Sequence, residues 1–247
     1  MSDPFAEAAL LMADSRYALA REYSAPLGTI TAGRLKMPRG SGNLTIRGAA
    51  DPSLLFQARF GSVMAEVVSD DEGAVRVIYH RHGGPVKRAF SRPEQHQGLL
   101  LLNRQVPWTI ACLGGTVAMR ADLRDLTVNA LTISHGVADV EIDLGAPGGV
   151  VPISIRGGVS QVTIRRPHGS AARVRVKGGA SKLTVDQHYL DAAGGTVVLA
   201  TADIDRMDAR YEFDIVGGVS NVRIITRAPA ADDRSAPPAD ESPRPAR

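Results

Sequence analysis

The chain has 247 residues, which is enough for one or two domains with a sizeable buried core. Only 4% of the residues are aromatic and the formal net charge is +3, which argues against an aromatic-lined ligand pocket and against a base-stacking nucleic-acid platform. A single cysteine, Cys112, excludes an internal disulfide.

The first predicted element is an N-terminal helical segment over residues 1–26. Asp3 and Pro4 fit a helix cap and first turn, and Phe5 and Leu11 follow at helical spacing. We find no basic region typical of a secretory signal and no apolar run of about 18 residues that could cross a bilayer. The sequence therefore predicts a cytoplasmic protein that would reach a membrane only through a partner.

Residues 27–105 are predicted to form short strands separated by turns. Residues 33–47 resemble the repeats found later in the chain, with Gly-Ser-Gly at the corner. The acidic turn 70–73 separates two apolar runs and predicts a hairpin. The polar stretch 80–98 is predicted to be a mobile loop.

From residue 108 the chain repeats a strand, a glycine corner and a second strand. The corners begin at positions 114, 135, 157, 178 and 217, at intervals of 21, 22, 21 and 39 residues, and His135 replaces the first glycine of its pair. The last interval is close to two periods and predicts that one copy is hidden or replaced between Asp186 and Arg210. Periods of about 20–50 residues are typical of solenoids. We therefore expect an all-β fold, a single-stack β-solenoid of about 21-residue repeats over residues 27–227, followed by a disordered tail over 228–247.

Alignment of the copies places apolar residues in three columns that should point inward and form a continuous core. The first column is Cys112, Ile133, Ile155, Val176 and Ile215; the second is Met119, Val140, Val162, Leu183 and Val222; the third is Ala121, Ile142, Ile164, Val185 and Ile224. The intervening residues should face solvent: Arg120, Glu141, Thr163, Thr184 and Arg223. The glycine pairs are expected to be structural corners, because no helix follows them to complete a phosphate loop.

Basic residues cluster in the repeats and give the candidate binding residues. They are Arg156, Arg165, Arg175 and Lys177, and Arg156 and Lys177 occupy equivalent positions in their copies. A stripe of this kind is either a solvated strand face or a contact for anionic lipid, cell-wall polymer or nucleic acid. Nucleic acid is the less favoured ligand, since base-stacking aromatics are scarce.

Acidic residues near 122–143 give an enzymatic alternative. Asp122 and Asp125 lie between two copies, while Asp139, Glu141 and Asp143 alternate along one strand. Such carboxylates could bind a cation or flank a glycosidic bond, as in a carbohydrate-active β-helix lyase or glycosidase. The simpler interpretation pairs them with neighbouring arginines across strands, which leaves no catalytic residue.

Histidines give a weaker indication of chemistry. His80, His82 and His96 form the densest histidine group, without the companion residues of a known metal motif, so no metal and no cofactor is predicted. A left-handed backbone at His135 would be unusual for a residue other than glycine.

Several stretches resemble the toastrack-type β-stack domains of bacteria. They are residues 44–52, Pro107-Trp108, GGVSQVTIRRP at 157–167, GGASKLTVD at 178–186 and YEFDIVGGVSNVRI at 211–224. The resemblance covers about residues 30–225. These domains include adhesin-like domains of unknown function and the C-terminal domain of membrane proteins that respond to cell-wall-active antibiotics. The resemblance implies a non-enzymatic module linked to envelope-stress signalling or assembly.

The sequence thus predicts a structural or protein-interaction module. It would bind a protein partner, or a second copy of itself, through edge strands or through the flat strand faces.

Overall fold

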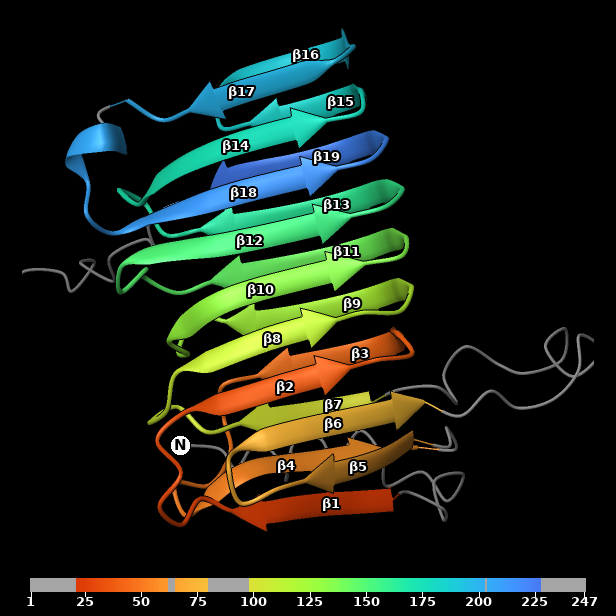
Figure 1. The fold of residues 1–247 in the computed structure, drawn as a ribbon, viewed down its shortest axis with the longest axis vertical. Coiled ribbons are helices and arrows are strands. Elements are labelled where there is room, and N and C mark those ends of the chain that lie inside the picture. The colour runs from red at the N-terminus through yellow and green to blue at the C-terminus, as the bar shows by residue number, and fades with distance from the viewer. Residues whose placement is uncertain (1–20, 62–64, 80–97, 203, 228–247) are drawn as a thin grey trace, which may run out of the picture.

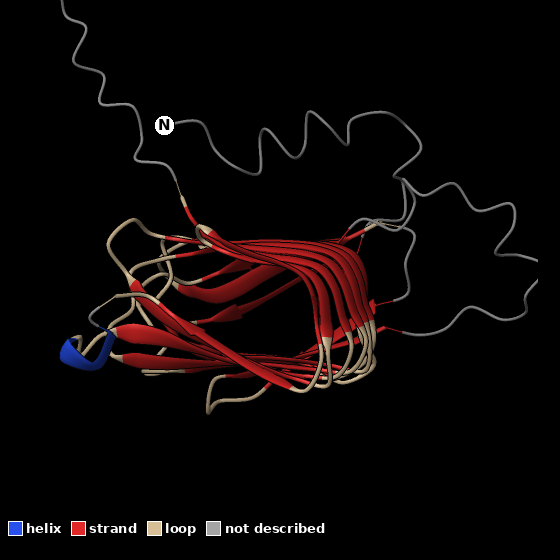
Figure 2. Cartoon of the chain, turned by 90° about the horizontal axis from the view of Figure 1, so that it is seen from above, coloured by secondary structure: helices blue, strands red, loops and turns tan. Residues whose placement is uncertain are grey.

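The computed structural model describes residues 21–61, 65–79, 98–202 and 204–227, and these residues form two facing β-sheets. We call the ten-stranded sheet sheet A and the nine-stranded sheet sheet B. Figure 1 shows the strands stacked along the long axis, and Figure 2 looks along that axis at the two layers. The all-β prediction is confirmed.

Six pairs of strands, which we call rungs, form the repeating part of the stack. Each rung has one strand in sheet B, a tight corner, and one strand in sheet A. The rungs are β2–β3 (Gly33–Met37, Ser41–Arg47), β8–β9 (Trp108–Cys112, Thr116–Leu123), β10–β11 (Val128–Ser134, Val137–Leu144), β12–β13 (Val150–Arg156, Val159–Arg166), β14–β15 (Ala171–Lys177, Ala180–Val185) and β18–β19 (Arg210–Val216, Val219–Thr226). Neighbouring rungs pair in parallel. The first rung confirms the early copy predicted at residues 33–47.

The rungs do not stack in chain order. The last rung, β18–β19, lies between β12–β13 and β14–β15, as the blue ribbons in Figure 1 show. Ile215 is in register with Ile155 on one side and with Val176 on the other. Because the rungs share one apolar pattern, their side chains fit against each other in either order, and repeat spacing alone does not show the insertion.

Between residues 186 and 210 the expected copy is replaced by other elements. This stretch forms β16 (His188–Ala193), β17 (Thr196–Ala200) and a short 3-10 helix at Ile204–Arg206. Strand β16 pairs antiparallel with β15, and β17 pairs antiparallel with β14. The interval of 39 residues therefore contains the two strands that end the stack and the connection back into it.

At the other end, the stack is completed by β1 (Arg21–Pro26), β4 (Leu54–Phe60) and β7 (Gly98–Leu102) in sheet A, and by β5 (Ala65–Ser69) and β6 (Ala74–Tyr79) in sheet B. The predicted hairpin around the acidic turn is confirmed as β5–β6. Residues 21–26 of the predicted helical segment form strand β1, in which Tyr23 and Ala25 alternate toward the core. The remainder of that segment, the loop at 80–97 and the predicted tail lie outside the described residues.

The three predicted columns form the core. All fifteen of their residues are buried, and each is in register with its equivalent in the neighbouring rung. Trp108 and Tyr211 extend this core, and both satisfy their polar atoms: the Trp108 indole donates to the Asn103 carbonyl at 2.8 Å, and the Tyr211 hydroxyl donates to the Gly145 carbonyl at 2.6 Å. The interior is consequently filled by aliphatic and aromatic side chains.

The corner glycines are required by the close approach of successive rungs. A Cβ placed on Gly114 would lie 2.2 Å from the Gly40 nitrogen, and one on Gly217 would lie 2.3 Å from the Gly157 oxygen. Gly217 also has a φ of +129°, and His135 takes the left-handed φ of 68° at its corner. The structural interpretation of the glycine pairs is therefore confirmed.

A second feature repeats in each rung just after the corner. One residue near the start of each sheet-A strand has a positive φ and is skipped by the strand register, so that two residues separate successive inward side chains. These residues are Asn43, Ala118, Asp139, Gln161, Lys182 and Asn221, with φ between 46° and 54°. A β-bulge in the usual sense places two residues opposite one on the partner strand; here every paired strand skips the equivalent residue and the register is kept, so we call the feature a stacked bulge. Asp139, Glu141 and Asp143 still alternate with the buried Val140 and Ile142, and the alternation of β11 is interrupted just before Asp139.

Candidate interaction surface

The predicted basic residues are divided between the two sheets. Arg156 is on β12, and Arg175 and Lys177 are on β14; all three are exposed on the outer face of sheet B. Arg165 is on β13 in sheet A. The structure thus brings three of the four candidates to one face and places the fourth on the opposite face.

The inserted strand β18 separates the basic residues of sheet B. Val216 lies in register between Arg156 and Lys177, and Asp214 lies between Ser154 and Arg175. The cations therefore form two groups on either side of β18 rather than one unbroken stripe. Among the described residues, none of these three cations has an ion-pair partner, and Arg156 donates only to the Ser154 hydroxyl at 3.3 Å.

Asp214 is the acidic residue in the middle of this face. Its Oδ1 atom is buried and accepts no hydrogen bond, and Arg175 lies in register beside it on β14. A buried carboxylate oxygen without a donor is uncommon and costly. The carboxylate reduces the local positive charge between the two cationic groups.

Arg165 belongs to a charge network on the outer face of sheet A. Glu141 on β11 contacts Arg120 at 2.7 Å on one side and Arg165 at 3.1 Å on the other. Asp143 contacts Arg165 at 3.5 Å and Arg227 at 3.4 Å. Arg165 is therefore already engaged with two carboxylates and is a poor candidate for binding an external anion.

The same network accounts for most of the acidic residues of the enzymatic alternative. Asp122 pairs with Arg124 at 2.6 Å, and Asp125 pairs with Arg104 at 3.5 Å. Hydrogen bonds from the arginines lower the pKa of Glu141, through Arg120 first, and of Asp122, through Arg124 first. These carboxyls are held ionised, whereas a general acid needs a raised pKa.

Among the described residues, Asp139 is the acidic candidate that forms no ion pair with an arginine, and it lies on the bulge of β11 with a φ of 53°. Cross-strand pairing, the simpler interpretation of the acidic group, therefore describes the contacts of Glu141 and Asp143. Asp122 instead pairs with an arginine two residues later in the chain, and the pair of Asp125 and Arg104 lies outside the strands.

An ion pair with a buried arginine, which the sequence analysis did not identify, lies at the ends of three strands of sheet A. Arg166, at the end of β13, is buried and pairs with Asp186, and it also donates to the Ser170 carbonyl. Asp186 in turn accepts a hydrogen bond from the Thr226 amide at 3.1 Å. This cluster joins the ends of β13, β15 and β19. The signal was available in the alternation, because Arg166 follows Val162 and Ile164 at inward positions.

His80, His82 and His96 lie outside the described residues. Within residues 21–61, 65–79, 98–202 and 204–227, no three histidine, cysteine or acidic side chains gather closely enough to hold a metal ion. In this same part of the chain, no helix has the length and hydropathy needed to cross a bilayer. Cys112 is buried in its predicted column, and burial raises its pKa to about 12.

The comparisons with known proteins agree with this architecture. Residues 15–165 match the family model described as the N-terminal domain of toast_rack, DUF2154. No curated protein matches the chain. A solved structure of a proposed cell adhesion protein from Clostridium sporogenes ATCC 15579 is 19% identical, with a TM-score of 0.70, and the match covers 84% of this chain and 99% of that one.

A proposed adhesin from Bacteroides fragilis NCTC 9343 is 9% identical with a TM-score of 0.23, and the match covers 84% of this chain and 96% of that one. The family match spans more than half of the chain and includes its first four rungs. The chain belongs to the family of toast_rack N-terminal domains, as the resemblance found in its repeats predicted.

Proposed function

We propose that this protein is a non-enzymatic protein-interaction module that binds an acidic partner on the outer face of sheet B. The observation that carries the proposal is the group of exposed, unpaired cations Arg156, Arg175 and Lys177 on that face. On the opposite face, Arg120 and Arg165 are neutralised by carboxylates. Unpaired charges on a flat face attract a partner of opposite sign and orient it.

The similar fold of the Clostridium sporogenes protein supports a role in binding, since that protein is described as a proposed cell adhesion protein. We further propose that the partner belongs to the cell-envelope response, on the strength of the family resemblance. A cytoplasmic location remains a prediction, and it requires that the partner present an acidic surface on the cytoplasmic side.

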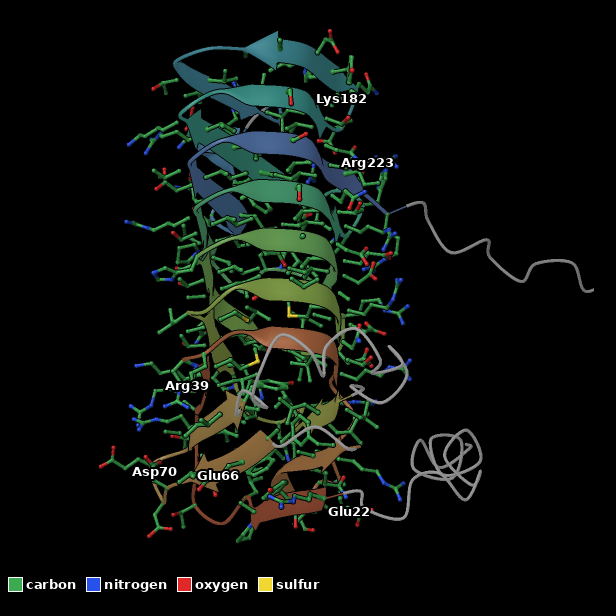
Figure 3. All side chains as sticks on the ribbon, turned by 90° about the vertical axis from the view of Figure 1, so that its right-hand side faces the viewer. Glu22, Arg39, Glu66, Asp70, Lys182 and Arg223 are labelled. Atoms are coloured by element: carbon green, nitrogen blue, oxygen red, sulfur yellow. The ribbon has the colours of Figure 1, made fainter. Side chains whose placement is uncertain are left out.

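The test is a comparison of partner capture by three forms of the full chain. The parent is immobilised beside Arg156→Ala/Lys177→Ala and beside a control, Lys182→Ala/Arg223→Ala, which removes two exposed cations from sheet A; Figure 3 shows these control residues on the sheet-A side. We expect the first variant to lose most of the captured partner and the control to retain it. Retention on the parent should also fall as salt screens the charges. Equal capture by all three forms would refute the cationic face as the binding surface.

The carbohydrate-active alternative is tested separately. A panel of polysaccharides is incubated with the parent and with Asp139→Asn, which removes the acidic candidate that no arginine engages. Turnover by the parent that is lost in the variant would replace the binding proposal with an enzymatic one.

A further inference from the structure

The described strands leave four free sheet edges, and one of them lacks the usual protection against pairing with another chain. Sheet A ends in β1 and β16, and sheet B ends in β5 and β17. Natural sheets block their edges with charged side chains or proline. Strand β1 carries Arg21, Glu22 and Pro26, β5 carries Glu66, and β16 carries Asp191.

Strand β17 has no such residue. Its sequence, Thr196–Ala200, contains no charge, proline or glycine, and three of its five residues are Thr or Val. Among the described strands it pairs with β14 alone, so one row of its backbone donors and acceptors faces away from the sheet. Figure 1 shows β17 with β16 at the upper end of the stack. An exposed apolar edge of this kind is a template for strand addition.

The side chains of β17 continue both faces of sheet B. Val197 and Leu199 are partly buried against the core, while Val198 points outward and is 54% exposed. Among the described residues Val198 is one of only a few large apolar side chains this exposed, and it sits on the unprotected edge.

We propose that β17 is a homodimerisation edge, paired antiparallel with β17 of a second copy about a twofold axis at Val198. This inference goes beyond the proposed function, because the second copy binds at a sheet edge and is not the acidic partner of the sheet face. The strand is self-complementary in that register: Val198 faces its own equivalent, Val197 faces Leu199 of the second copy, and Thr196 faces Ala200. No like charges meet, and apolar side chains are paired on the core side.

Dimerisation would have a consequence for partner binding. Arg175 is in register with Val198 on the neighbouring strand β14, so pairing at β17 would bring the cations of two copies onto one continuous sheet face. An acidic partner long enough to span both copies would then bind with added avidity.

The test uses sedimentation velocity of the purified full chain, without any partner, across micromolar concentrations. Val198→Glu places two carboxylates opposite each other in the dimer, and within one copy it faces Arg175, so the fold is preserved. Val198→Lys tests the same position with the opposite charge. The matched control is Val150→Glu, because Val150 is 50% exposed but lies on β12, in the interior of sheet B.

We expect the parent and the control to show a concentration-dependent dimer, and each Val198 variant alone to weaken it at least about tenfold, since like charges opposite each other destabilise strand pairing. Mixing the Glu and Lys variants should restore a dimer that contains one of each. A monomeric parent, or a dimer unaffected by both variants, would overturn the inference. Either result leaves the capture experiment untouched, so failure here is distinguishable from failure of the proposed function.

Discussion

At the scale of single residues, the two glycines of a corner have different tasks. The first glycine approaches the backbone of the next rung, as Gly217 does at Gly157, whereas a Cβ on Gly218 would meet nothing within 4 Å. Sequence reasoning identified the pair as a corner but could not separate the two, because the close contact comes from a rung distant in the chain.

This difference predicts unequal costs for alanine. Gly217→Ala should lower the free energy of unfolding by at least about 2 kcal/mol, from the clash and the left-handed φ. Gly218→Ala should change it by less than about 0.5 kcal/mol. Chemical denaturation of both variants measures the two values. Equal destabilisation would show that the corner backbones are not in contact.

The core columns were predictable residue by residue, whereas the bulges were not. Columns follow from the shared apolar pattern, which burial alone enforces. The bulge residues are chemically varied, from Ala118 to Lys182, and the backbone conformation rather than the side chain is conserved between rungs. A left-handed φ is signalled in sequence mainly by glycine, asparagine or aspartate, so a bulge at lysine or glutamine carries no signal.

At the scale of elements, the insertion of β18–β19 depends on contacts at the strand ends. Arg166 and Asp186 come from rungs on either side of β19, and Thr226 belongs to β19 itself. The buried pair therefore holds the two neighbouring rungs and the inserted rung together.

We predict that Asp186→Asn destabilises the protein by about 3 kcal/mol, because Arg166 remains buried without a counter-charge. Asparagine keeps the acceptor for the Thr226 amide and tolerates the positive φ of this position. The control is Asp122→Asn, whose partner Arg124 is exposed, and its cost should stay below about 1 kcal/mol. Thermal denaturation of both variants provides the comparison, and similar losses would remove the special role of the buried pair.

At the scale of the whole molecule, surface charge couples stability to pH. The pKa is lowered for Asp51 by hydrogen bonds within the Ser53 turn, for Asp122 by Arg124 and for Glu141 by Arg120. The folded state therefore binds fewer protons than the unfolded state in mildly acidic solution. This contribution is complete above the ordinary pKa of about 4 and is lost as the pH falls through the lower folded-state values.

The urea concentration at the midpoint of unfolding should accordingly stay constant between pH 7 and pH 5 and decline below about pH 4. In Glu141→Gln the decline should be shallower, because one of the contributing carboxyls is absent. A midpoint that rises on acidification would contradict the ion-pair network.

The type of architecture was predictable from the sequence, but the order of the strands in the sheets was not. Periodicity predicted an all-β stack, and the corners predicted where its strands turn. The position of each rung was not encoded in that pattern, because any two copies present matching apolar residues to each other. The separation of the sheet-B cations by β18, and the identity of the free edges, follow from the order of the strands and were therefore missed. The placement of Arg165 in the other sheet was predictable, because it follows its corner whereas Arg156 precedes its own.

The order of the strands is thus the claim on which the binding face and the dimer edge both depend, and disulfide formation tests it most directly. In a Cys112→Ser background, Ser154→Cys with Asp214→Cys places two thiols on neighbouring strands in register, and Ser154→Cys with Arg175→Cys places them two strands apart. Neighbouring strands lie about 4.8 Å apart, within the reach of a disulfide, whereas twice that spacing is beyond it. We predict that mild oxidation closes an intramolecular disulfide in the first variant and not in the second; a disulfide in the second variant alone would place β12 directly beside β14 and contradict the account.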